Sequence, residues 1–553
     1  MIRWLLAQSL ALTVAMVWPA PLWLGRAALG HPAADGPKHL WTLWWMRREA
    51  LGGEPGLLTT LVNFPDGMRL FPIEPLNGAL AVVLPLPVVP LSNALAMAHL
   101  LLTGLAAGWL GWEVTQRRAG AHVAAALFQC SAFAAFALQV GVGELRQLWW
   151  LPLGFAMAVR ARRTRDRRWF GALGLTLALA TMACFYLGFF LALGVAVWAI
   201  ATMERAVVAG WVLAGAIAAA GVAPGVAAFG ESWGGRATHE APGDAATPLE
   251  LVAPRVLDRG TEAQQAYGGG RYLGWVTLGL AAWGIAGARR ASLPWVAVGC
   301  VGVICSFGTS LELAGQRVAM PLAWAWAPLA VIAAPPNFPA RFVALACLAL
   351  AVLAAMAPWT WGRAWLVGLA VADVAANDRV RWPRYTFVPP DVAALATAGG
   401  EGAVLDLTLV GDNDHTTRMR AAAAQIALDR PTQVVPVERV EAWATSGAEW
   451  TRGLSLARAL ARVHDETAGA VVTDARADAW LLREAGFDRV LLTWRPTGPD
   501  ERATKLVDAA FGEPLATSPR GAVWAVPAVE ATPHEAALWK EAHAARVAAG
   551  RGR

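Results

Sequence analysis

The chain has 553 residues, a formal net charge of +6 and an apolar fraction of 57%, but only 16% of its residues are charged. About a quarter of the residues of a soluble globular protein are charged, so a single soluble domain of this length is excluded. The basic residues gather in short loops between apolar runs, which is typical of cytoplasmic loops, and we expect no nucleic-acid partner.

Apolar runs long enough to cross a membrane follow one another through residues 1–377. The first, Trp4–Gly25, lacks a convincing small-residue cleavage site and is interpreted as an uncleaved helix, not a signal peptide. Further spans are predicted over about 91–113, 120–138, 147–160, 169–185, 187–203, 206–229, 271–288, 293–307, 341–358 and 364–377. These runs predict a polytopic α-helical membrane protein with about eleven transmembrane helices.

Orientation follows from the basic loops. On this count they all fall on one side, which should be cytoplasmic: Arg117/Arg118, Arg160–Arg168, Arg205, Arg289/Arg290 and Arg363. The opposite face then receives two long outer loops, 26–90 and 230–270. Two Pro-containing apolar stretches, 76–90 and 321–335, are interpreted as re-entrant or interfacial elements.

The first outer loop contains a Trp-rich segment, HLWTLWWMRRE, over residues 39–49. Trp41, Trp44 and Trp45 share one helical face through their i, i+3, i+4 spacing. The pattern is typical of an amphipathic helix lying on the membrane surface. An ordinary buried helix is the alternative.

Residues 378–553 have the composition of a soluble domain and alternate strand and helix patterns. Strands are predicted at 403–409, 433–437, 470–472, 489–492 and 523–526, and helices at 453–464, 476–486, 500–511 and 533–549. This alternation predicts a C-terminal soluble α/β domain, which the orientation places outside the cytoplasm.

Two acidic residues lie at the expected outer ends of membrane helices. Asp35 follows the first span, and Glu144 lies in a very short hairpin between two spans. Charged groups beside the hydrocarbon layer are costly and often mark function, and a carboxylate there can act as a general base. The alternative is a solvated loop acid, or a partner for Lys38 or Arg146.

Other polar residues near these acids have two interpretations each. Arg341 begins a late span on the outer side, where it either meets a phosphate or extends to the lipid headgroups. Glu74 lies in a segment that resembles a turn returning the loop to the membrane. His31, His39 and Asp35 together offer metal ligands, although their spacing matches no strong metal pattern. No cofactor is firmly implied, and a divalent metal stays open.

Four segments resemble the GT-C-type membrane glycosyltransferases, and within them a bacterial branch of large membrane proteins. They are GHPAADGPKHLWTLWW after the first helix, NFPDGMRLFPIEPLNG later in the first loop, GVGELRQLWWLPLGFA around Glu144, and NFPARF around Arg341. The superfamily places its key Asp after the first helix, where this chain has Asp35. Together these matches span about residues 4–345. They favour a GT-C-like domain over 1–377, followed by an extracytoplasmic domain over 378–553.

The resemblance implies inverting transfer of a sugar from a polyprenyl-phosphate donor, at the outer face of the bacterial inner membrane. Asp35 matches the position of the superfamily's base, and Glu144 matches a possible second acid. We expect Lys38, His39, Glu74 and Arg341 to bind the substrates, with Arg341 or Lys38 stabilising the leaving phosphate. The expected partners are the lipid bilayer, the lipid-linked donor and a glycan, lipid or protein acceptor.

Two other functions fit the sequence. A non-catalytic scaffold or accessory protein of envelope glycan assembly would keep Asp35 and Glu144 ion-paired or solvated, whereas the enzyme would line an outward-facing cavity with Asp35. A transporter or lipid flippase would need charged residues midway through several spans and repeat symmetry. The charges lie mostly at the ends of the expected helices, which disfavours transport.

Overall fold

The computed structural model separates the chain into two compact units. The described residues are 2–25, 27–31, 34–52, 58–233, 245–253, 269–313, 316–321, 338–377, 385–386, 399–409, 415–434, 445–464, 472–494, 500–519 and 521–550. The first unit comprises Met1–Gly36, Ile73–Gly230 and Gly235–Thr386, and the second comprises Pro37–Pro72, Glu231–Gly234 and Phe387–Arg553. This division differs from the expected boundary at residue 377, because part of the first outer loop groups with the C-terminal segment.

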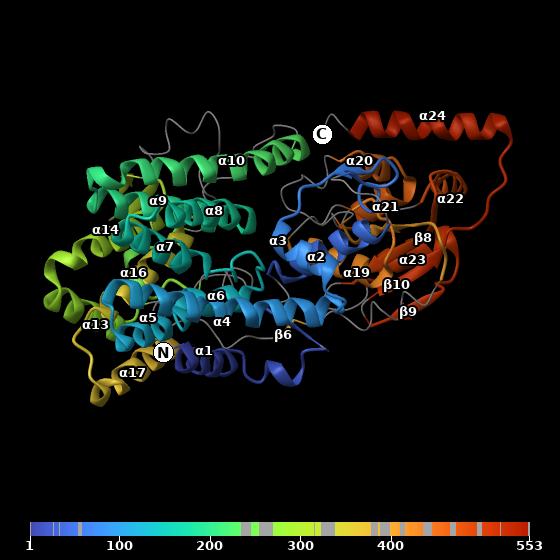
Figure 1. Ribbon diagram of the computed structural model, residues 1–553. Helices are drawn as coiled ribbons and strands as arrows, with labels where there is room; N and C mark the ends of the chain where they lie inside the picture. Colours follow the sequence, from blue (N-terminus) through green and yellow to red (C-terminus); the bar gives the residue numbers. More distant parts are fainter. Residues whose placement is uncertain are drawn as a thin grey trace. The chain divides into compact units, whose positions relative to one another are not determined.

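Helices form most of the first unit (Figure 1). They are α1 Ile2–Val17, α3 Pro75–Val83, α4 Val88–Thr115, α5 Arg118–Gln129, α6 Ala132–Val140, α7 Trp150–Thr164, α8 Arg167–Ala183, α9 Phe185–Ala201, α10 Val208–Trp233, α11 Pro248–Val252, α13 Trp275–Gly287, α14 Arg289–Ser306, α16 Val343–Ala355 and α17 Trp365–Asn377. Each predicted span overlaps one of these helices, except that 120–138 is divided between α5 and α6. The stretch 321–335 lies almost entirely outside the described residues.

Length and apolar composition mark a smaller set of these helices as membrane-spanning. Within the described part of the chain, Val88–Thr115 and Arg205–Ala228 are long and apolar enough to cross a membrane. The bent pair α5 and α6, with a 40° angle at the break, forms a third span if it is counted as one. Five further apolar helices have 10–17 residues. The figure of about eleven crossings therefore stays a prediction.

The centre of the first unit is α16, whose residues are nearly all buried. It packs against α13, α14 and α5. Glycines allow this close approach, because a Cβ on Gly302 would stand 2.7 Å from the backbone nitrogen of Ala346, and one on Gly284 would collide with the carbonyl oxygen of Leu353. Small residues of this kind at helix contacts are typical of membrane helix packing.

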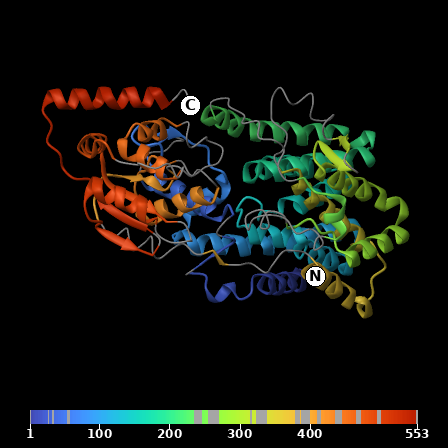
Figure 2. The same cartoon turned by 180° about the vertical axis from the view of Figure 1, so that it is seen from behind.

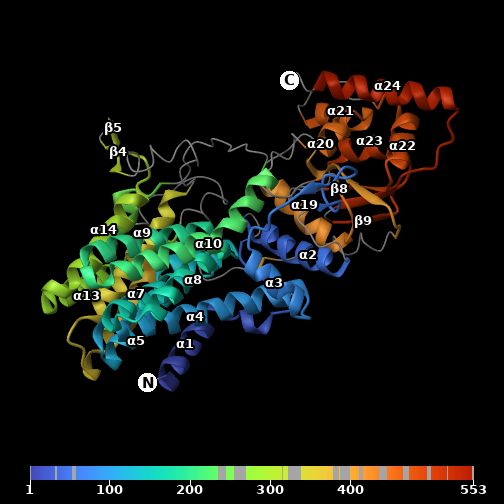
Figure 3. The ribbon, with the colours of Figure 1, turned by 45° about the horizontal axis from the view of Figure 1, so that its top comes forward.

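Short strands connect the helices of the first unit. β1 Ala28–Leu29 pairs antiparallel with β6 Tyr385–Thr386, which brings the segment after α1 beside the end of this unit. β4 Ser310–Leu313 and β5 Gln316–Ala319 form an antiparallel hairpin after α14 (Figure 3).

The second unit contains a four-stranded sheet with helices around it (Figure 2). The strands are β7 Ala403–Asp406, β8 Phe487–Thr493, β9 Ala516–Ser518 and β10 Gly521–Ala525, in the order β7-β8-β10-β9. Only β7 and β8 are parallel. The helices are α2 Gly36–Gly52, whose first residue closes the first unit, α19 His415–Leu428, α20 Ser446–Arg452, α21 Ser455–His464, α22 Ala475–Glu484, α23 Glu501–Phe511 and α24 Pro533–Gly550.

The sequence patterns locate most of these elements. The strand predicted at 403–409 ends at Asp406 and continues as a 3₁₀ turn, Leu407–Leu409. The predicted strands 433–437 and 470–472 lie largely outside the described residues, although Thr432 makes an isolated parallel bridge to Val404. An α/β arrangement is therefore present, and its solubility stays a prediction.

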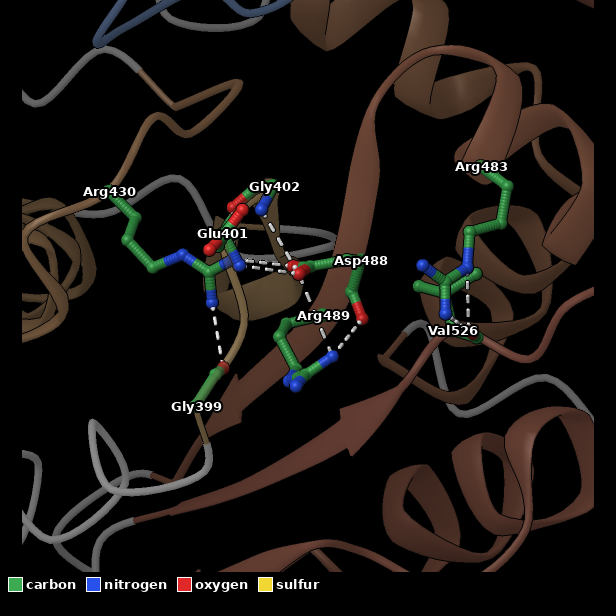
Figure 4. A network of polar contacts seen from close by, with 8 residues as sticks. All are labelled: Gly399, Glu401, Gly402, Arg430, Arg483, Asp488, Arg489 and Val526. Carbon is green, nitrogen blue, oxygen red and sulfur yellow. Dashed lines mark hydrogen bonds and ion pairs between the residues drawn. The ribbon is translucent and has the colours of Figure 1, made fainter.

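An ion-pair network fastens the start of β8 to the segment before β7 (Figure 4). Asp488 forms a salt bridge of 2.6 Å with Arg430 and accepts hydrogen bonds from the backbone of Glu401 and Gly402, each at 3.0 Å. Arg430 also donates to the carbonyl oxygens of Gly399 and Gly402. Because Asp488 and Arg430 are largely buried and doubly bonded, this network stabilises the sheet edge, and it includes no nucleophile or metal ligand set.

The Trp-rich helix α2 corrects one prediction. Trp41, Trp44 and Trp45 are all at most 8% exposed, so this face is not a membrane-surface face. The indole nitrogen of Trp41 donates to Gln425 at 2.7 Å, and that of Trp44 donates to Asp429 at 3.0 Å. The alternative, a buried helix, is correct, because the Trp face packs on α19 within the second unit.

The loop after α2 is also bound within the second unit. A short antiparallel pair, β2 Leu58–Thr59 and β3 Met68–Arg69, closes it. The backbones of Phe64 and Thr432 are joined by a hydrogen bond of 3.1 Å, and the Asn63 side chain accepts from the backbone of Gly447 at 2.8 Å. These bonds explain why Pro37–Pro72 groups with the C-terminal segment.

Candidate functional site

The loop that carries Asp35 is held to the first unit by one side chain of α4. The Asn93 side chain accepts a hydrogen bond from the backbone of Leu29 at 2.8 Å and donates to the carbonyl oxygens of Leu24 and Ala27 at 2.9 and 2.8 Å. An amide can act as acceptor and donor at once, so Asn93 alone makes three hydrogen bonds to the segment that precedes Asp35. Asp35 itself is 7% exposed.

Glu144 lies in a tight hairpin between α6 and α7. α6 ends at Val140 and is capped by Gly141, whose φ of +74° is a left-handed conformation that glycine adopts without strain. Turn hydrogen bonds join the backbone of Val142 to Leu145 at 3.1 Å and to Arg146 at 3.3 Å. The hairpin therefore has a fixed backbone, and the Glu144 side chain is 6% exposed.

The Asp35 loop and the Glu144 hairpin touch through glycine. A Cβ on Gly141 would stand 3.0 Å from the Cα of Gly36 and 3.3 Å from the Cα of Gly30. Arg146 joins the same two segments, because its guanidinium donates to the carbonyl oxygen of Leu29. Burial lowers the pKa of Arg146 to about 10, and the Glu74 carboxylate opposes this shift. Arg146 is therefore positively charged at neutral pH.

Arg341 brings a positive charge to this pair of segments. It lies in the 3₁₀ turn Pro339–Phe342 that begins the α16 segment, and it is 6% exposed. Its guanidinium stacks between two rings, with its carbon 4.2 Å from the Phe338 centroid and 4.7 Å from the Tyr186 centroid. The charges that act on it include the carboxylates of Glu144 and Asp35. Asp35 and Glu144, which the sequence singled out separately, are therefore near enough to Arg341 for their charges to act on it.

Glu74 lies at the start of α3 and is 1% exposed. Its carboxylate accepts a hydrogen bond of 2.7 Å from Asn77 and fills the space beside Gly143, where a Cβ would collide with it. Glu74 is therefore next to the hairpin that carries Glu144. Its predicted role in substrate binding stays a prediction.

A cavity of about 10 Å³ lies beside Arg341, enough for about one water molecule. Its lining includes a second arginine, Arg271, which forms a 2.8 Å salt bridge with Glu250 of α11. Burial raises the pKa of Glu250, but the Arg271 charge and the hydrogen bonds from Thr247 outweigh burial, and the net pKa is lowered. This cavity does not include Asp35, so an outward-facing cavity lined by Asp35 stays a prediction.

Lys38 and His39 belong to the second unit, in the first turns of α2, and both are buried. Their predicted substrate contacts stay predictions. Among the described residues, no group of three or more His, Cys, Asp or Glu side chains is arranged to hold a metal ion. The suggested set of His31, His39 and Asp35 therefore gains no support, and metal use stays open.

Sequence reasoning missed several residues that shape this site. Asn93 and His99 lie inside the span predicted over 91–113, where polar side chains in an apolar run are the signal for a function or a structural bond. Tyr186 had no such signal, because an aromatic residue in a membrane helix is ordinary. Tyr186 and Arg341 are far apart in the sequence, so no local pattern could predict their contact.

The chain has the fold of the GT-C-type membrane glycosyltransferases. Three solved structures carry this conclusion. The oligosaccharyltransferase of Archaeoglobus fulgidus, tethered to an acceptor peptide, superposes with a TM-score of 0.52 at 10% identity, covering 88% of this chain and 68% of that one.

The second and third structures cover more of this chain. The arabinofuranosyltransferase AftD from Mycobacteria has a TM-score of 0.50 at 15% identity, over 96% of this chain and 42% of AftD. ArnT from Cupriavidus metallidurans, bound to undecaprenyl phosphate, has a TM-score of 0.50 at 13% identity, over 96% and 99%. No protein-family model matches the chain, and no curated protein matches it in sequence. At these identities the likeness establishes the fold.

Proposed function

We propose that this protein is a membrane glycosyltransferase that moves a sugar from a polyprenyl-phosphate donor to an envelope glycan, lipid or protein. The observation that carries the proposal is that the carboxylates of Asp35 and Glu144 act electrostatically on Arg341, although the three residues come from distant segments of the chain. Two carboxylates beside a stacked guanidinium provide both a proton acceptor and a site for a phosphate charge.

In the proposed reaction Asp35 accepts the proton of the acceptor hydroxyl. The hydroxyl oxygen forms a bond to the anomeric carbon while the bond from that carbon to the donor phosphate breaks, which inverts the configuration. Arg341 stabilises the negative charge on the departing phosphate. Glu144 orients the acceptor, and Glu74 contributes a further substrate contact.

The solved structures support the proposed substrate classes. ArnT has been seen with undecaprenyl phosphate and the oligosaccharyltransferase with an acceptor peptide, so the same fold accommodates both a lipid phosphate and an acceptor. We propose the bacterial inner membrane as the location, with the second unit outside the cytoplasm, because the basic loops then lie inside.

A scaffold function is the second candidate, and one observation favours it. Asp35 and Glu144 both interact with Arg341, so the carboxylates are compensated, as a structural ion-pair cluster would be. A scaffold would tolerate replacement of Asp35 by Asn where the fold is kept. An enzyme that needs a proton acceptor would not.

The test is incorporation of polyprenyl-phosphate-linked sugar into envelope glycans by cells that carry wild-type protein, Asp35→Asn or Glu144→Gln, with membrane levels measured for each. Asp66→Asn is the matched control, because Asp66 is an exposed acid of the same outer loop. Loss of transfer by Asp35→Asn at a normal protein level supports the enzyme. Wild-type transfer by Asp35→Asn, with an altered glycan on deletion of the protein, supports the scaffold.

A further inference from the structure

Four side chains of the first unit form a hydrogen-bonded chain that ends at Glu74. The indole nitrogen of Trp149 donates to Nδ1 of His99 at 3.1 Å, Nε2 of His99 lies 2.9 Å from Oδ1 of Asn77, and Nδ2 of Asn77 donates to Glu74 at 2.7 Å. Trp149 precedes α7, His99 belongs to α4, and Asn77 belongs to α3. We call these four residues the Glu74 relay.

The chemistry of the groups fixes the direction of the relay. An indole N–H only donates, so Nδ1 of His99 must accept and Nε2 must carry the ring proton. That proton can be donated only to the amide oxygen of Asn77, so the amide nitrogen faces Glu74. The Glu74 carboxyl group accepts the hydrogen bond from this nitrogen, so the relay fixes which way the Asn77 amide faces.

The end of the relay touches the hairpin that carries Glu144. The Glu74 carboxylate occupies the space beside Gly143, one residue before Glu144, and it interacts electrostatically with Arg146. Arg146 in turn donates to Leu29, in the loop that leads to Asp35. The orientation of Glu74 is therefore coupled to both acidic segments of the site.

We propose that Asn77, His99 and Trp149 are positioning residues for the sugar transfer. They hold Glu74 against the hairpin and so keep Glu144 in its position relative to Asp35. None of the three is assigned contact with the reacting atoms. The expected change in the rate of sugar transfer rests on the proposed function. The expected change in hydrogen exchange of the hairpin does not.

Two substitutions at one position separate this inference from simple packing. In His99→Gln the amide nitrogen takes the place of Nε2 and still donates to Asn77. In His99→Asn the amide oxygen takes the place of Nδ1 and still accepts from Trp149, but the bond to Asn77 is lost. Both variants remove the same ring from α4, so only the positioning role predicts different outcomes.

We expect His99→Asn to lower kcat about tenfold, the effect of about one hydrogen bond, and to leave KM for the acceptor nearly unchanged. His99→Gln should stay within about threefold of wild type. Hydrogen–deuterium exchange in the full-length protein in detergent should rise across 141–149 in His99→Asn only. His122→Asn is the matched control, because His122 lies on α5 and pairs with Gln8.

Equal losses in the two His99 variants, or unchanged hairpin exchange in His99→Asn, overturn the relay. The exchange measurement does not depend on catalysis. If wild-type protein transfers no more sugar than Asp35→Asn, the proposed function fails, and the exchange difference between the two His99 variants still decides whether the relay holds the hairpin.

Discussion

Two buried charge clusters of the first unit lie at opposite ends of α4. Asn93 anchors the Asp35 loop near one end, and Glu113 meets two arginines near the other. These positions are 20 residues apart, or about 30 Å along the helix axis, which is about the thickness of the hydrocarbon layer of a membrane. The two clusters therefore lie where the two faces of one membrane are expected.

The two clusters differ in how their charges are balanced. The fully buried Glu113 carboxylate forms salt bridges of 2.9 Å with Arg160 and 2.6 Å with Arg163, and Trp109 donates to it at 3.0 Å. One carboxylate thus faces two guanidinium groups on rigid helices. Such buried ion pairs are typical of a structural link between two helices, here α4 and α7.

At the other end, three carboxylates, those of Asp35, Glu74 and Glu144, face the guanidinium groups of Arg146 and Arg341. Two of the three carboxylates lie on loops that meet through glycine. Carboxylates held on segments shaped by tight turns, beside arginine side chains, are candidates for chemistry. Acidic and basic side chains therefore fasten helices at one end of α4 and form a candidate site at the other.

The largest effect is expected at Asp35. Removal of a general base costs about 10²–10⁴ in rate, so Asp35→Asn should reduce transfer by at least about a hundredfold while thermal unfolding in detergent stays near that of wild type. Single-turnover transfer and an unfolding curve measure the two quantities. If Asp35→Asn transferred sugar normally, the Asp35 cluster, like the Glu113 cluster, would have only a structural role.

The opposite result is expected for the Glu113 cluster. In the double variant Arg160→Ala/Arg163→Ala the buried Glu113 charge loses both partners, which should lower the free energy of unfolding by about 3–5 kcal/mol. Glu113→Gln should cost less, because the two arginine side chains are 36% and 41% exposed and can turn to water. Unfolding midpoints and transfer per folded molecule test this asymmetry. Equal costs for the two changes would contradict it.

The sequence predicted one of these clusters better than the other. Asp35, Glu144 and Arg341 stood out because a charge at the end of an apolar run is locally visible, and the charges of Asp35 and Glu144 act on Arg341. Local patterns could not pair Glu113 with Arg160, since that contact depends on how α4 and α7 pack.

The same limit explains the errors of the fold prediction. The Trp face of α2 has the spacing of a membrane-surface helix, but spacing alone does not reveal that Trp41 meets Gln425, 384 positions away. The apolar runs did locate the helices of the first unit, because burial in lipid or protein requires continuous apolar sequence. Polar residues with distant partners, such as Asn93, give only a weak local signal in the sequence.

Gly141 tests the backbone contact that distinguishes the Asp35 cluster. Its φ is +74°, and a Cβ would press on the backbones of Gly36 and Gly30. Gly141→Ala should cost about 1–2 kcal/mol in backbone strain and lower transfer about tenfold by shifting Glu144 away from Asp35. Gly279→Ala on α13 is the control, because no atom lies within 4 Å of its added Cβ. Equal activity of the two variants would exclude a catalytic need for the contact.

The smallest effect is expected where charge balance serves only to hold a loop. Burial raises the pKa of Glu250, but the charge of Arg271 and the hydrogen bonds from Thr247 and Arg271 together outweigh burial, so the pKa is lowered in the folded protein. A lowered folded-state pKa means that the stabilisation is present above the unfolded pKa of about 4.3 and is lost as the pH falls through the folded value. Exchange protection of 245–253 should therefore be constant from pH 7 to about 5 and fall below about pH 4.

Glu250→Gln checks the assignment at neutral pH. The amide keeps a hydrogen bond with Thr247 but loses the ionic attraction to Arg271, so protection of 245–253 should fall about fivefold and its acid dependence should disappear. Protection that still falls in acid in this variant would assign the transition to another group. A large loss of transfer in the same variant would show that the ion pair between Glu250 and Arg271 affects the Asp35 cluster. Clusters that stabilise the fold and the cluster proposed for the reaction would then not be independent.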